Sequence, residues 1–251
     1  MEKLFIGTAG WQYPEWKNSF YPRGMPTSQF LTHYSSVFNA VELNSSYYRL
    51  PRPETIMEWK VRTQSDFKLC PRLIQAITFK NKLKKGDNLL KAFLGHFLPL
   101  DDRLGPVIIE IPQDIPFSHE NVEPFLDMLG RFSHHYTFVI EPRHVSWMDP
   151  RAGKMCEERE LTWSISDFCG RIPTIQKTIG DNVYLRFHGT QNLKESRYTV
   201  DTLLYCSEKV KHWLEEGKTV YVFFNNNFGG YALDNAKEFQ KLVQGTGSTV
   251  R

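Results

Sequence analysis

Charged residues interrupt or follow several short apolar runs of the sequence, and their side chains are the ones that could do chemistry. Glu42 lies within AVELN, Glu141 ends TFVIE, and Arg186 and His188 fall in VYLRFH. A carboxylate or an imidazole can transfer a proton, whereas a guanidinium offers forked donors that suit phosphate or carboxylate. Glu42, Glu141 and His188 are therefore the candidate catalytic residues.

Further polar and aromatic residues follow the same runs and could hold a substrate. The stretch NNNFGG after VYVFF is uncharged and tolerates left-handed backbone, and loops at this place in a barrel often bind phosphate. Aromatic rings could stack on a base or a sugar, although they also serve as core residues. The candidate binding residues are Trp11, Asn44, Tyr48, Arg143, His144, Trp147, Arg186, Asn225 and Asn226.

The elements that must position these residues are short β-rich runs that alternate with helix-length amphipathic stretches. This alternation is typical of parallel strands joined by helical crossovers. Helices are expected over 29–38, 88–98, 121–132, 203–216 and 232–242. The eight predicted strands are Leu4–Gly7, Ala40–Asn44, Phe67–Pro71, Val107–Ile111, Thr137–Glu141, Thr162–Ser166, Val183–Phe187 and Val220–Phe224.

Eight such strands predict an α/β fold, a single (β/α)8 TIM-type barrel. The barrel is one domain over residues 1–251, with a core over 4–242 and a short flexible C-terminal tail. An open doubly wound sheet is the alternative, but neither GxGxxG nor GxxxxGK[ST] follows the first run. In a barrel, the polar residues at the strand ends would meet at one mouth.

Composition limits the partners and the compartment. The 251 residues carry 31 Lys plus Arg and 28 Asp plus Glu, a net charge of +3, so any preference for anions must be local. No apolar run is long enough to span a membrane and no signal peptide begins the chain. Four cysteines without CxxC spacing indicate reduced thiols. We expect a cytoplasmic protein without a membrane partner and with an unknown oligomeric state.

Structural roles compete with the functional ones. Buried charges are rarely left unpaired, so Glu42 could form an ion pair with a barrel arginine instead of reacting, and Arg143 and Arg186 could neutralise the acids. His144 and His188 could be hydrogen-bonded structural residues or metal ligands. A divalent metal could bind near Glu42 and Asp167, but the strand ends supply few ligands and the metal stays unknown.

The segments that hold these residues resemble the YecE-like family, number seventy-two among the domains of unknown function. The resemblance implies a TIM-type barrel and no established reaction. The family looks similar in architecture to sugar isomerases and apurinic-site endonucleases, an analogy that suggests a role on phosphate or DNA. One departure is Phe79, where members often have His. The similar segments are GTAGWQYPEWKNSFYP, FNAVELNSSYYRLP, FKLCPRLIQAIT, LGPVIIEIP, FVIEPRHVSW, YLRFHG and VYVFFNNNFGGYALDNA.

Three functions remain open. The first is an enzyme that acts on a phosphate-bearing substrate, such as a hydrolase of the phosphodiesterase or nuclease type, with a nucleic acid or a phosphorylated small molecule as partner. The second is a protein that binds such ligands without chemistry. The third is a carbohydrate-active enzyme, which requires the carboxyl groups of Glu42 and Glu141 to lie about 5 to 9.5 Å apart.

Overall fold

The predicted barrel is confirmed by a computed structural model, which describes residues 3–84, 86–167, 178–190 and 196–245. Eight parallel strands run in the order β3-β2-β1-β8-β7-β6-β5-β4. Isolated bridges, Leu69 to Leu104 and Arg72 to Ile108, connect the two end strands, so the barrel is nearly closed. The strands are β1 (Leu4–Ala9), β2 (Ala40–Leu43), β3 (Lys68–Pro71), β4 (Val107–Ile111), β5 (Phe138–Pro142), β6 (Thr162–Asp167), β7 (Asn182–Phe187) and β8 (Thr219–Phe224).

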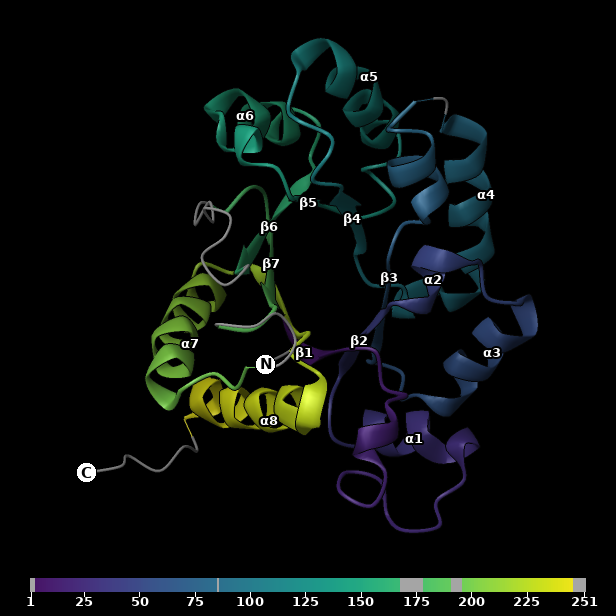
Figure 1. Ribbon diagram of the computed structural model, residues 1–251, viewed down its shortest axis with the longest axis vertical. Helices are drawn as coiled ribbons and strands as arrows, with labels where there is room; N and C mark the ends of the chain where they lie inside the picture. Colours follow the sequence, from purple (N-terminus) through teal and green to yellow (C-terminus); the bar gives the residue numbers. More distant parts are fainter. Residues whose placement is uncertain (1–2, 85, 168–177, 191–195, 246–251) are drawn as a thin grey trace.

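Helices lie around the outside of the strands (Figure 1). The five expected helices are present, and α2, α3 and α6 are additional. Helix α6 could have been found, because Asp149 caps it by accepting a hydrogen bond from the Arg151 amide and Pro150 begins it. The helices are α1 (Phe30–Ser35), α2 (Ser45–Tyr48), α3 (Pro53–Arg62), α4 (Asp87–Phe97), α5 (His119–Gly130), α6 (Pro150–Glu157), α7 (Val200–Glu215) and α8 (Tyr231–Gln244).

Three expectations concern the chain as a whole: the C-terminal tail, the absence of a membrane span and the state of the cysteines. The expected C-terminal tail falls largely on residues 246–251, outside the described residues. Among the described residues, no helix is long and apolar enough to cross a membrane. Of the four cysteines expected to be reduced, Cys70, Cys156 and Cys206 are unbridged in the described part of the chain, and Cys169 lies outside it.

The barrel interior is divided into layers, because side chains on a strand alternate between its two faces. An apolar layer fills the middle. The residues two positions further along four strands, Glu42, Glu110, Glu141 and Arg186, are charged. The alternation thus puts a charged layer directly next to the apolar one, toward the carboxyl ends of the strands. The apolar layer consists of Phe5, Ala40, Cys70, Ile108, Val139, Tyr184, Tyr221 and Phe223.

Strands β1 and β2 approach each other closely at Gly7. A Cβ atom at this position would lie 1.9 Å from the carbonyl oxygen of Ala40 and 2.8 Å from the Tyr34 hydroxyl. That hydroxyl also bonds the Thr8 amide and the Ala40 carbonyl, so it fixes the spacing between the strands. Only a residue without a side chain fits there.

We expect Gly7→Ala to lower the free energy of unfolding by about 3 kcal/mol or more, because the collision is with backbone that cannot move aside. Gly153→Ala is the matched control. Its Cβ would make an ordinary 3.7 Å contact in helix α6, and alanine should add about 0.5–1 kcal/mol there. Urea unfolding of both variants measures the difference. Equal stability would show that β1 and β2 tolerate a wider separation.

Candidate functional site

Arg186 of β7 binds two carboxylates from opposite sides of the barrel. Its Nε and Nη2 lie 2.8 and 2.9 Å from the two oxygens of Glu42 on β2. Its Nη1 donates to Glu141 on β5. All three side chains are buried, and the Tyr184 hydroxyl donates to Glu42 at 2.8 Å. The ion pair with a barrel arginine, one of the two readings of Glu42, is the arrangement found.

Glu141 has the largest number of partners in this layer. Besides Arg186, it accepts hydrogen bonds from Ser166 Oγ at 2.6 Å, His188 Nε2 at 3.1 Å and Arg143 Nη2 at 3.3 Å. Burial alone would raise its pKa, but Arg186, Arg143 and His188 together hold the pKa of Glu141 well below its ordinary value. Glu141 is therefore a stable carboxylate and a poor proton donor.

His188 is held neutral and both of its ring nitrogens are engaged. Burial, and then the positive charge of Arg186, lowers its pKa to about 4. Nε2 faces Glu141, while the side-chain amide of Asn225 lies 3.1 Å from Nδ1. Asn227 in turn donates to the Asn225 side-chain oxygen at 3.2 Å. Asn225 and Glu141 thus fix the tautomer of the buried His188 imidazole.

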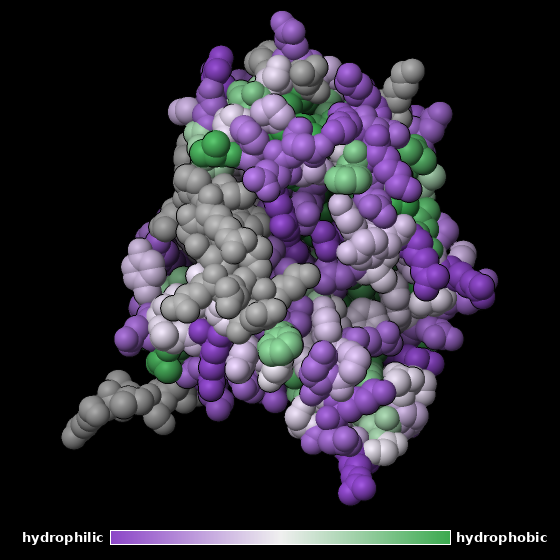
Figure 2. All heavy atoms as spheres, viewed as in Figure 1, coloured by the Kyte–Doolittle hydropathy of each residue, from purple (hydrophilic) through white to green (hydrophobic). Residues whose placement is uncertain are grey.

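A second set of polar side chains, the outer level, extends from Glu110 of the charged layer toward the mouth of the barrel. Arg72, which follows β3, and Arg143, which follows β5, both donate to one oxygen of Glu110, at 2.7 and 2.6 Å. Arg72 also donates to the Asn44 side chain at 3.0 Å, and its guanidinium lies 4.4 Å from the centre of the Tyr47 ring. These side chains are partly exposed. Figure 2 shows hydrophilic residues gathered around the centre of this face.

The structure places several predicted binding residues away from this centre. Trp147 is buried in the core, where it donates to the Ile115 carbonyl and packs near Trp163. The sequence prediction for it missed that the 3-10 turn after β5 folds the indole inward. Asn226 is also buried, and its amide donates to Ser196 and Asn235.

The remaining predicted residues lie near the rim. Trp11 lines a pocket of about 230 Å³ together with Tyr13 and Asn44. Tyr48 is exposed beside Tyr47. His144 is half-buried, with Nδ1 accepting a hydrogen bond from the Ser146 amide. Phe79, at the position where similar sequences often have His, is exposed in the turn after β3.

Sequence reasoning missed Arg72 and Glu110. Both carry the signals that selected the other residues: Glu110 interrupts the apolar run VIIEI, and Arg72 directly follows KLCP. Among the described residues, no group of three His, Cys, Asp or Glu side chains could hold a metal ion. The polar set is instead rich in arginine, asparagine and serine.

Asp167, at the end of β6, holds the backbone of His188. It accepts hydrogen bonds from the His188 amide at 2.7 Å and from the Tyr198 hydroxyl. Burial raises the pKa of Asp167 to about 6 in spite of both bonds. Asp167 therefore binds a proton in the folded state at a pH where the unfolded chain has lost it.

A nearly closed ring of parallel strands with helices outside and a polar mouth defines a TIM-type barrel protein. Residues 5–250 match the family model described as "Protein of unknown function DUF72", and the chain belongs to this family.

Individual relatives agree with this assignment. The UPF0759 protein YecE of Escherichia coli is 31% identical over 143 residues, which are 56% of this chain and only 48% of YecE, so the match spans about half of that relative. YunF of Bacillus subtilis is 24% identical over 96% of this chain and 94% of its own. The crystal structure of a DUF72 family protein from Thermotoga maritima has a TM-score of 0.86 at 29% identity, covering 96% of this chain and 99% of that one. None of these names states a reaction.

Replacing Arg186 by methionine should lower the free energy of unfolding by about 3–5 kcal/mol, because it leaves buried Glu42 without a counter-charge and buried Glu141 with Arg143 alone. Adding Glu42→Gln and Glu141→Gln to this variant should recover part of the loss. Lys154→Ala, which removes an exposed 3.8 Å pair with Glu158, should cost at most about 0.5 kcal/mol. Urea unfolding checks all three variants. Equal costs for Arg186→Met and Lys154→Ala would contradict the central role of Arg186.

The pKa values of Asp167 and His188 make opposite contributions to stability between about pH 4 and 6. The raised pKa of Asp167 makes stability fall as pH rises through this range, whereas the lowered pKa of His188 makes it rise. In Asp167→Asn only the second contribution remains, so the gain in stability from pH 4.5 to 6.5 should exceed that of the unmodified protein by up to about 2 kcal/mol. Thermal or urea unfolding at both pH values measures this gain, and identical gains would contradict the raised pKa.

Proposed function

We propose that the barrel mouth binds a phosphate-bearing small molecule and that Arg72 and Arg143 hold its anionic group. The observation that carries this proposal is that two partly exposed guanidinium groups converge on one oxygen of a single carboxylate, Glu110. A planar guanidinium suits the oxygens of a phosphate, and Arg72 is further oriented by Asn44 and Tyr47.

The charges are distributed so that an anion would stay at the mouth. The deep level has two carboxylates, Glu42 and Glu141, for one guanidinium and a neutral imidazole. The outer level has two guanidinium groups, Arg72 and Arg143, around Glu110, and Arg143 also lies 3.3 Å from Glu141. An anion is attracted by the outer level and repelled by the deep one. This assigns the anion to Arg72 and Arg143, and differs from the pair Arg143 and Arg186 suggested by sequence, because Arg186 is buried and bound to both acids.

Hydrolysis of a phosphodiester has less support than binding. His188 has both ring nitrogens engaged and a pKa of about 4, so it is a weak base with no nitrogen directed to a substrate. The carbohydrate-enzyme hypothesis needs an acid with a raised pKa, whereas the pKa of Glu141 is lowered and Glu42 is bound by Arg186. Binding without assigned chemistry is the function these residues favour.

Phosphorus NMR tests binding and hydrolysis in one experiment, with inorganic phosphate, glucose 6-phosphate, AMP and a thymidine dinucleotide as probes. We expect the resonance of at least one phosphomonoester to shift or broaden on addition of protein. Arg72→Gln should weaken this binding about 10- to 100-fold, because a charge-assisted hydrogen bond to a phosphate is lost.

The control variant is Arg62→Gln on α3, whose arginine is 37% exposed in its side chain and lies in a pair with Glu58. It should bind each probe like the unmodified protein. Unchanged binding in Arg72→Gln, or no binding of any probe at millimolar concentration, would refute the proposal. A new phosphorus resonance that appears with time would establish hydrolysis, and preference for the dinucleotide would redirect the proposal to nucleic acid.

A further inference from the structure

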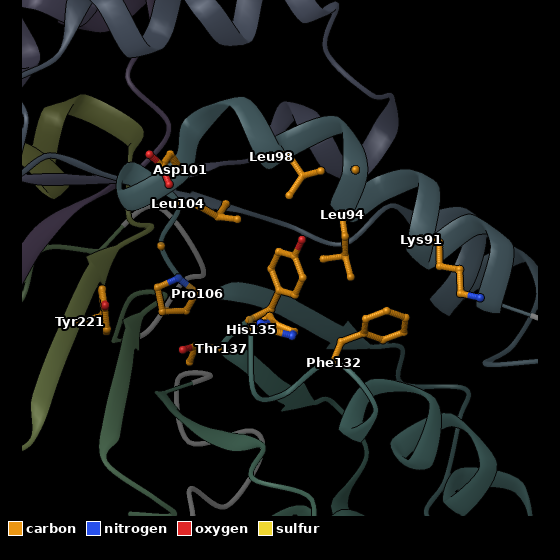
Figure 3. A pocket seen from close by; sticks show the side chains of 13 residues that line it. Lys91, Leu94, Leu98, Asp101, Leu104, Pro106, Phe132, His135, Thr137 and Tyr221 are labelled. Carbon is orange, nitrogen blue, oxygen red and sulfur yellow. The ribbon is translucent and has the colours of Figure 1, made fainter.

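A cavity of about 660 Å³ lies at the end of the barrel opposite the mouth. Its lining comes from the residues that precede β4 and β5, including Leu104, Pro106 and Thr137, and from Tyr221 near the start of β8. Helix α4 and the turn that follows it form one wall (Figure 3). Cavities of 300 to 1,000 Å³ with an apolar lining and a few polar groups are typical of small-molecule sites.

The α4 wall is formed by one face of the helix and by Leu98, which directly follows it. Lys91, Leu94, Gly95 and Leu98 all line the cavity and are spaced as i, i+3, i+4 and i+7, which puts them on one side. Leu98 is 61% exposed, so this wall offers apolar surface that no side chain of the described part covers. An apolar ligand in the cavity would cover it.

Gly95 has no structural reason to lack a side chain. A glycine inside a helix costs about 1 kcal/mol relative to alanine. Its φ is not in the left-handed range, and a Cβ atom there would have no neighbour within 4 Å. Neither backbone conformation nor close packing requires glycine at this position. Its effect is to leave space in the cavity wall.

The residue at the other end of the cavity is strained. Asp101 has φ 54° and ψ −125°, a backbone conformation that residues other than glycine rarely adopt. Strain of this kind costs about 1–3 kcal/mol and clusters at binding sites, where surrounding structure maintains it. Figure 3 shows Asp101 at one end of the cavity and Lys91 at the other, with Leu94, Leu98 and Leu104 between them.

We infer that this cavity is a second binding site, for a small amphipathic carboxylate with an aromatic or branched apolar body. Leu94, Leu98, Leu104 and Phe132 contact the body. Lys91 attracts the carboxylate to its end, and the Asp101 carboxylate repels it from the other, which sets one orientation. The site shares no lining residue with the mouth and does not depend on the function proposed there.

Titration calorimetry or ligand-observed NMR with 2-naphthoate tests this inference, with 2-(aminomethyl)naphthalene as the probe of opposite charge. We expect naphthoate to bind more tightly than the amine. Lys91→Gln should weaken naphthoate binding about fivefold, as expected for a charge at an exposed rim. Tighter binding of the amine would overturn the assigned charge, and no binding of either probe at millimolar concentration would overturn the site.

Gly95→Leu locates the site. Leucine should fill the cavity and reduce naphthoate binding at least tenfold, while the helix itself becomes more stable. Ala92→Leu is the matched control, because it changes an exposed position of the same helix that does not line the cavity and should leave binding unchanged. Equal naphthoate binding in Gly95→Leu and the unmodified protein would show that the probe binds elsewhere and would refute the proposal.

Discussion

The arrangement of this barrel depends on one buried guanidinium. Arg186 lies between Glu42 and Glu141, which come from strands on either side of it, and no other described positive charge contacts Glu42. Two buried carboxylates are tolerated only with a counter-charge and enough hydrogen bonds. Tyr184, Ser166 and His188 supply those hydrogen bonds. The positions of these three side chains near the mouth are therefore set by the two buried acids.

Because of this constraint, the buried charged residues near the mouth have a structural role, and the residues that could bind a ligand are different ones. Arg186 binds the two acids that the sequence singles out, Glu42 and Glu141. The pKa of Glu141 is lowered by the surrounding positive charges, and burial lowers that of His188. The partly exposed guanidinium groups lie one level further out, at Arg72 and Arg143. The carboxylates of the charged layer therefore position the outer arginines. Because side chains on a strand alternate between its faces, the charged residues follow the apolar ones at intervals of two positions toward the mouth.

Much of the fold could be predicted because parallel strands buried on both faces are near-continuous apolar runs, such as Val107–Ile111. The pairing of Glu42 with an arginine was foreseen as one of two readings. Which strand faces which, and how deep each side chain lies, could not be foreseen. Trp147 and Asn226 follow strands as Arg143 and Asn225 do, but the 3-10 turn after β5 folds Trp147 into the core, and Asn226 is buried against Asn235. Glu110 and Arg72 were missed although the same pattern marks them.

The two ends of the barrel are joined by one column of side chains. Tyr221, which lines the cavity opposite the mouth, stacks near Tyr184 with ring centres 6.0 Å apart. The Tyr184 hydroxyl donates to Glu42, which is the partner of Arg186. A packed column transmits a change only if it has two arrangements of similar energy. Here each ring is buried and the Tyr184 hydroxyl is fixed on a carboxylate that a bidentate arginine holds. We therefore expect this column to keep one arrangement and not to couple a ligand at one end of the barrel to a ligand at the other.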